Sequence, residues 1–196
     1  MSSPAALPVR RHLSERQADT VARLLDAAAA EVRATSYEGL TVRGVARRAG
    51  VAPATAYTYF ASKEHLLAEV FHRRLLALAP VRPDRRRGPA ERVSAAVSEM
   101  ALLVADEPEL AAAVTTAMLA HDPDVRHIRD QIGTLFLERI ESALGPDAEP
   151  ALLRALIVSF AGAMLTAGMG NIRYDELPEL MADITSLMTR SGRRPR

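Results

Sequence analysis

Residues 41–60 read TVRGVARRAGVAPATAYTYF, and ASKE follows directly at 61–64. The stretch predicts two short helices joined by a tight turn. Gly50 falls where the turn calls for a left-handed residue, and Pro53 falls at the first position of the second helix, where its missing N–H costs nothing. This spacing is typical of a helix-turn-helix, which places one helix in the major groove of DNA.

The second predicted helix carries hydroxyl side chains suited to DNA. Thr and Tyr hydroxyls bind phosphates, and Thr methyls or Tyr rings can meet the methyl group of thymine. In the first turn of the next helix, the Lys63 ammonium and free backbone N–H groups can bind one phosphate together. These residue types predict DNA contacts from Arg43, Thr55, Tyr57, Thr58, Tyr59 and Lys63.

The stretch resembles the N-terminal pattern of the TetR (tetracycline-repressor-like) family of bacterial regulators, roughly T-x-R-x-I-A-x-x-A-G-V-S-x-G-T-L-Y-x-Y-F-x-S-K-E-x-L. The resemblance covers about residues 14–70, and the matching positions include Thr41, Arg43, Ala46, Ala49, Gly50, Val51, Thr55, Tyr57, Tyr59, Phe60, Ser62, Lys63, Glu64 and Leu66. In that family, the residues matching Thr41, Arg43, Thr55, Tyr57, Tyr59 and Lys63 commonly touch DNA. The alternative, an ordinary pair of helices around a glycine with packed tyrosines, does not explain so many agreeing positions.

Three positions depart from the pattern. Ala52 replaces the usual capping serine, Ala54 replaces a glycine and Ala56 replaces a larger apolar residue. The lost cap costs about 1 kcal/mol of local helix stability, which Pro53 partly offsets. These changes bear on base preference rather than on DNA binding itself.

Helical periodicity continues along the chain, and no segment alternates as a strand does. The predicted helices lie near 14–39, 42–49, 53–60, 63–79, 90–105, 108–119, 123–144, 148–170 and 178–190. The loop at 80–89, PVRPDRRRGP, is the predicted domain boundary. The resemblance implies an all-α, Ω-like homodimer of about nine helices per subunit. We expect an N-terminal helix-turn-helix domain at 14–80 and a C-terminal ligand-binding and dimerisation domain at 88–190, between a flexible arm at 1–13 and a disordered tail at 191–196.

Charge and composition narrow the class of protein. Residues 1–80 carry 11 Lys/Arg against 7 Asp/Glu, whereas residues 81–196 carry 14 against 17, so the N-terminal part is the basic one. A basic N-terminal part on a less basic remainder of the chain favours binding of a polyanion by that part. Cysteine is absent, which excludes disulfides and thiolate chemistry. No apolar run reaches the roughly 18 residues of a membrane span, and residues 1–13 lack the apolar core of a signal peptide. We expect a cytoplasmic protein with no membrane partner.

Residues 155–170, ALIVSFAGAMLTAGMG, are apolar on nearly every side. A helix of this kind is buried on every side, which predicts packing within the subunit on one face and against a second subunit on the other. With Met181, Ile184, Leu187 and Met188 of the last helix, it predicts a four-helix dimer interface. The central core helix of a monomer is the alternative.

The C-terminal part also predicts a cavity for an apolar effector, because methionine adapts to irregular shapes and few inward positions are charged. The candidate lining residues are Met100, Leu103, Met118, Leu119, Phe136, Ile140, Phe160 and Met164. An ordinary core is the alternative for each of them.

No pattern predicts an enzyme, a metal site or a cofactor. His121, Asp122, Asp124 and His127 superficially resemble a metal cluster, but Asp122 before Pro123 is more simply a helix cap. Acidic pairs lie in turns without a nucleophile or base nearby. An all-helical enzyme that kept this fold is therefore disfavoured.

Together these features predict a transcriptional regulator, a repressor that binds a palindromic double-stranded DNA operator as a homodimer. A hydrophobic small-molecule effector would release it. The alternative is a ligand-independent DNA-binding protein whose C-terminal domain only dimerises or docks a protein partner.

Overall fold

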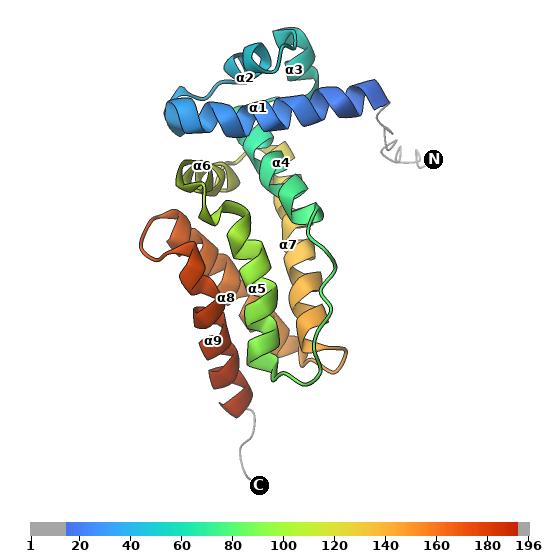
Figure 1. The fold of residues 1–196 in the computed structure, drawn as a ribbon, viewed down its shortest axis with the longest axis vertical. Coiled ribbons are helices and arrows are strands. Elements are labelled where there is room, and N and C mark those ends of the chain that lie inside the picture. Colours follow the sequence, from blue (N-terminus) through green and yellow to red (C-terminus); the bar gives the residue numbers. More distant parts are fainter. Residues whose placement is uncertain (1–14, 192–196) are drawn as a thin grey trace, which may run out of the picture.

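The computed structural model describes residues 15–191, and every regular element in that range is a helix (Figure 1). This confirms the predicted all-α class. The elements are α1 (Glu15–Gly39), α2 (Val42–Arg48), α3 (Pro53–Tyr59), α4 (Lys63–Leu76), α5 (Pro89–Ala105), α6 (Pro108–Met118), α7 (Pro123–Leu144), α8 (Pro150–Gly168), the 3-10 turn η1 (Tyr174–Glu176) and α9 (Leu177–Ser191). The expected arm at 1–13, the helix start at Ser14 and the tail beyond residue 191 lie outside the described residues.

Several helix ends differ from the prediction for local reasons. α4 ends at Leu76 rather than near residue 79, and Ala79 is in any case disfavoured in a helix because it precedes Pro80. α8 begins at Pro150 rather than at 148, with proline in its first turn. It ends at Gly168, and Gly170 then takes a left-handed conformation at φ 78°.

The helices form two groups that meet at α4 and α6. In Figure 1, α1 crosses one end of the molecule with α2 and α3 on its outer side, and α5, α7, α8 and α9 run away from it. α4 leaves the first group and packs along α7, while α6 packs against both α1 and α4. The two groups are therefore joined by helix packing as well as by the loop before α5.

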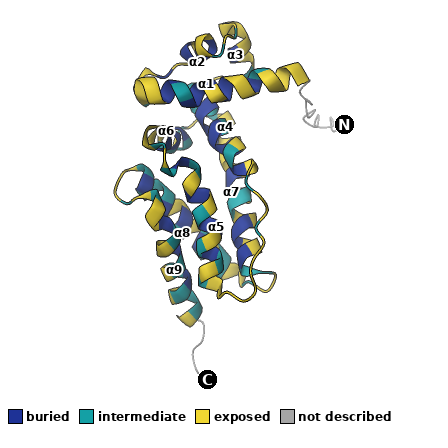
Figure 2. Cartoon of the chain, viewed as in Figure 1, coloured by how far each residue is buried: buried dark blue, intermediate teal, exposed yellow. Residues whose placement is uncertain are grey.

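The core of the first group follows the helical periodicity of α1. Val21, Leu24, Ala28 and Val32 recur at helical spacing and are buried; Figure 2 shows buried positions alternating with exposed ones along α1. They pack with a second set of buried residues, which includes Leu40, Val45, Ala46, Phe60, Leu66, Leu67 and Phe71. Burying a side chain of the size of Leu24 contributes about 1.5–3 kcal/mol.

A row of phenylalanines connects the two groups. Phe71 on α4 meets Phe136 on α7 edge-on at 6.3 Å between ring centroids, and Phe136 meets Phe160 on α8 at 4.9 Å. Edge-to-face pairs are favourable beyond the area they bury. The row fixes α4, α7 and α8 to one another.

Within this chain, α8 is buried on one face only. Its buried side chains are Leu156, Phe160, Ala163 and Ala167, whereas Val158 on the other face is 72% exposed. One packed face is what the sequence predicted for this helix within the chain, and cover of the other face by a second subunit stays a prediction. At 19 residues and a mean hydropathy of 1.7, α8 is long and apolar enough to cross a membrane, although it packs here against α7 and α9.

Candidate nucleic-acid interface

The turn between α2 and α3 is held from both sides. The Thr41 hydroxyl oxygen caps α2 by accepting a hydrogen bond from the Gly44 N–H at 3.0 Å. Gly50 takes φ 64° in the turn, where glycine carries no steric penalty. From α1, the Arg23 guanidinium donates to the carbonyls of Ala49 and Gly50. The turn is thus fixed to the helix beneath it.

A buried carboxylate supports α2 from below. Glu31 on α1 is buried and accepts a hydrogen bond from Arg48 Nε at 2.5 Å. A Cβ at Gly44 would lie 3.0 Å from both Glu31 Oε1 and Thr41 Oγ1, so glycine permits this close approach. These roles of Arg23, Glu31 and Gly44 were missed by the sequence analysis.

α3 has exposed hydroxyl-bearing side chains, of which the Thr58 hydroxyl donates to the Ala54 carbonyl at 3.1 Å. The helix begins at Pro53, and Ala52 before it provides no side-chain cap, as the sequence predicted. Ala56 faces inward and is fully buried, whereas Tyr57 is 53% exposed, and Thr55 and Thr58 are also exposed. The small residue at 56 lets the helix lie close to the core while the neighbouring positions remain open.

Lys63 is anchored at the start of α4. Its ammonium donates to the Tyr37 carbonyl oxygen at 2.8 Å and lies 3.9 Å from the centre of the Tyr37 ring. The Tyr37 hydroxyl donates to Glu64 at 2.6 Å, and burial, aided by this carboxylate, raises the pKa of Tyr37 to about 12. An ammonium has three protons, so Lys63 retains donors for a phosphate.

The residues predicted to contact DNA differ in how far they are exposed. Thr41, Arg43, Thr55, Tyr57 and Thr58 are exposed in the layer of α2 and α3 outside α1, while Tyr59 and Lys63 are half-buried. Arg47, one turn after Arg43, is also exposed, and neither arginine forms an ion pair with a described residue. Arg47 follows Arg43 by four positions, which places both on one face of a helix. This spacing could have identified Arg47 from the sequence.

The residues predicted to line an effector cavity are mostly interior. Met100, Ile140 and Phe160 are fully buried, and Leu103, Met118, Phe136 and Met164 are half-buried. Leu119 is instead 56% exposed, which corrects its inward placement, because α6 ends at Met118 and the chain turns outward. None of these eight residues lines the pocket between α3, α4 and α7, the groove where α5, α6 and α8 meet, or the hollow between α1 and α4.

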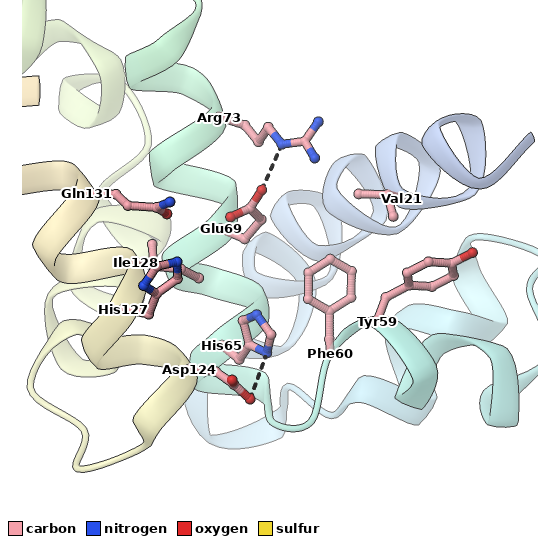
Figure 3. A pocket seen from close by; sticks show the side chains of 10 residues that line it. All are labelled: Val21, Tyr59, Phe60, His65, Glu69, Arg73, Asp124, His127, Ile128 and Gln131. Atoms are coloured by element: carbon pink, nitrogen blue, oxygen red, sulfur yellow. Dashed lines mark hydrogen bonds and ion pairs between the residues drawn. The ribbon is translucent and has the colours of Figure 1, made fainter. Parts of the chain in front are cut away.

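The first pocket lies between the two groups of helices (Figure 3). His65 on α4 and Asp124 on α7 face each other there, 3.6 Å apart. Beside it, the Ser62 hydroxyl donates to Asp122 at 2.6 Å, which lowers the pKa of Asp122. Asp122 also caps α7 through the Asp124 N–H. In the range 15–191, no three His, Asp or Glu side chains are arranged to hold a metal ion. The His65–Asp124 and Ser62–Asp122 contacts join the start of α4 to the start of α7.

A larger groove, of about 600 Å³, lies beside α6. It is formed where α5 ends, α6 begins and the chain runs from α8 into η1. Its walls are mainly apolar, and its lining includes Leu102, Ala105, Ala111, Ala112, Ala167, Met169 and Ile172. This groove could not be predicted from the sequence, because no periodic pattern identifies a space made by helix ends and a loop.

Comparison with known proteins gives related sequences. A model of the bacterial regulatory proteins of the tetR family matches residues 24–70. An uncharacterised HTH-type transcriptional regulator of Mycobacterium tuberculosis (strain H37Rv) is 43% identical over 196 residues, covering 99% of this chain and 91% of the relative. The HTH-type transcriptional repressor KstR of Mycolicibacterium smegmatis is 31% identical, covering 76% of this chain and 74% of the repressor.

Solved structures share the fold. A TetR transcriptional regulator from Rhodococcus sp. RHA1 has a TM-score of 0.73 at 21% identity, covering 90% of this chain and 98% of that one. FadR of Thermus thermophilus, solved with lauroyl-CoA, has a TM-score of 0.61 at 20% identity, covering 90% and 96%.

Proposed function

The chain belongs to the tetR family of bacterial regulatory proteins, and from this we propose that it is a cytoplasmic repressor that binds a palindromic operator as a homodimer and leaves it when an apolar effector binds. The observation that carries the proposal is the exposed layer of α2 and α3. Its hydroxyl and guanidinium groups surround a turn that Arg23 and Glu31 hold in place. A rigid support of this kind suits a helix that reads base edges.

The outer face of α8 supports a dimer. Val158, Ala161 and Gly162 are exposed on this face, and Leu180 on α9 is 38% exposed. An exposed apolar patch of this kind marks an interaction surface. Gly168, in contrast, faces α6, because a Cβ there would lie 2.0 Å from Thr115 Oγ1. The Val158 and Gly162 side of α8 is therefore the proposed dimer seam.

An apolar effector is supported by the composition of the C-terminal helices and by the groove beside α6. The fold neighbour FadR of Thermus thermophilus was solved with lauroyl-CoA, and FadR of Bacillus subtilis, with a TM-score of 0.57, was solved with stearoyl-CoA. Long apolar chains are thus bound by proteins of this fold. The alternative, a regulator without a ligand, predicts that no apolar compound changes DNA affinity.

The proposal is tested by fluorescence anisotropy with a duplex selected from a random-sequence pool. The protein should bind the selected duplex as a dimer, and at least one member of an apolar compound library that includes lauroyl-CoA should weaken that binding. The compound should also raise the melting temperature of the free protein, because it binds the folded state. Operator binding that no compound in the library alters would instead favour the ligand-independent alternative.

A further inference from the structure

The groove beside α6 has the size and walls of a small-molecule site. Its volume of about 600 Å³ lies within the range of ligand pockets. Leu102 and Met169 on its walls are 58% and 61% exposed. α6 and α8 touch closely nearby, since a Cβ at Gly168 would overlap Thr115. A ligand that entered the groove would cover apolar side chains at the junction of α5, α6 and α8.

The charges at this groove are mainly negative. The Arg173 guanidinium donates to both carboxylate oxygens of Asp175, at 2.8 and 2.7 Å, so its charge is already paired. Asp106, also on the lining, forms no ion pair with a described residue. α5 and α8 both end at the groove, where helices carry partial negative charge. The positive end of α6 carries Glu109 in its first turn, while the charge of Glu107 is already paired with Arg33 and Arg74.

An aromatic ring at the groove adds to this preference. Tyr174 lines the groove and is half-buried. Burial raises the pKa of Tyr174, and a tyrosine is neutral at neutral pH even at its ordinary pKa. A neutral tyrosine face attracts a cation. Apolar walls, an unpaired carboxylate and this ring together suit a ligand with an apolar body and a positive charge.

The groove adjoins the contact between the two groups of helices. Asp106 and Pro108 line it, and Glu107 between them forms ion pairs with Arg33 on α1 and with Arg74 on α4. Arg74 also donates to the Leu103 carbonyl of α5 at 2.8 Å. A ligand that moves the α5–α6 corner therefore acts directly on the helices that carry the helix-turn-helix.

We propose that this groove is an effector site for an apolar cation, and that its occupation displaces the Glu107 corner and weakens DNA binding. The proposal rests on the proposed function for its effect on DNA, but ligand binding itself does not. It differs from an acyl-CoA site in the sign of charge that the groove favours.

Two probes of matched shape test the charge preference. Tetraphenylphosphonium and tetraphenylborate both carry four phenyl groups around one atom and differ in sign. Calorimetry of the free protein should show one phosphonium bound per subunit. The borate should bind at least roughly tenfold more weakly than the phosphonium. Asp106→Asn should reduce that preference, whereas Asp147→Asn, at an exposed loop position outside the groove, should not. Equal affinity for the two ions overturns the proposal.

Two further variants test the location and the coupling. Ala112→Phe fills the groove and should abolish phosphonium binding, while Thr116→Phe, at an exposed position one turn further along α6, should not. Phosphonium should also weaken operator binding by the wild type. Binding that survives Ala112→Phe in a folded protein, or that leaves operator affinity unchanged, overturns the proposal. A failure of the protein to bind any DNA would count against the proposed function, and the calorimetry would still decide the groove.

Discussion

At the scale of single residues, the α2–α3 layer separates side chains that hold the turn from side chains that remain open. Arg23 donates to a carbonyl of the turn, and Glu31 accepts a hydrogen bond from Arg48. Arg43 and Arg47 form no such pairs among the described residues. An unpaired, exposed arginine is available to a phosphate, whereas a paired one fixes the backbone. The first kind should govern affinity and the second kind the geometry of the reading helix.

Arg47→Ala should weaken operator binding and lower the slope of log affinity against log salt by about 1, because one phosphate contact is lost. Arg126→Ala, at an exposed position on α7, is the matched control and should leave the slope unchanged. Anisotropy titrations over a range of salt concentrations measure both. Identical slopes for Arg47→Ala and the wild type would remove Arg47 from the interface.

Glu107 should make the stability of the protein depend on pH. Hydrogen bonds and ion pairs with Arg74 and Arg33 lower the pKa of Glu107. A lowered carboxyl pKa stabilises the fold above the unfolded value, roughly 4.3, and this contribution is lost as the pH falls through the folded value. Glu107→Gln should therefore cost about 1 kcal/mol at pH 7 after solvent screening, and less at pH 3.

Urea unfolding of the wild type and Glu107→Gln at several pH values measures this difference. Glu109→Gln is the control, since Glu109 is exposed and forms no ion pair with a described residue. A gap between Glu107→Gln and the wild type that stays constant down to pH 3 contradicts the assigned ion pairs.

At the scale of elements, α8 serves two surfaces at once. One face joins the phenylalanine row, and the other exposes Val158 and Gly162. Sequence periodicity alone did not separate these faces, because both are apolar. The helix itself could be predicted from its composition, but which side is buried within the subunit depends on where α7 and α9 lie.

Gly162→Arg should dissociate the dimer without unfolding the subunit. Nothing lies within 4 Å of a Cβ built at Gly162, so the subunit accommodates a side chain, while a charge in an apolar seam is costly. Gly133→Arg on α7 has the same free space and should remain dimeric. Sedimentation at micromolar concentration distinguishes them, and a Gly162→Arg variant that stays a dimer would place the seam elsewhere.

Phe160→Ala should cost about 3–5 kcal/mol of stability, because it removes a fully buried ring and leaves a cavity. The loss should be cooperative over the whole chain, since the row from Phe71 to Phe160 joins α4, α7 and α8. Leu76→Ala, at a 52% exposed position, should cost far less. Chemical denaturation followed by circular dichroism measures both, and equal losses would contradict the role of the row.

At the scale of the whole molecule, the sequence predicted the helices and the helix-turn-helix well, because caps, Pro53, Gly50 and apolar spacing act locally. It did not predict the contacts from Arg23 and Glu31, which join residues 26 and 17 positions apart. The groove beside α6 was also hidden, since it forms only when the ends of α5 and α8 meet. Long-range packing, rather than local preference, decides these features.

The central claim is that two α2–α3 layers of a dimer bind one operator. Hydroxyl-radical footprinting on the selected duplex tests it most directly. The wild type should protect two patches centred roughly 10 base pairs apart, or a multiple of that spacing, on one face of the DNA. Tyr57→Ala should lose both patches together while its fold persists. No protection by the wild type, or an unchanged footprint with Tyr57→Ala, would contradict the account.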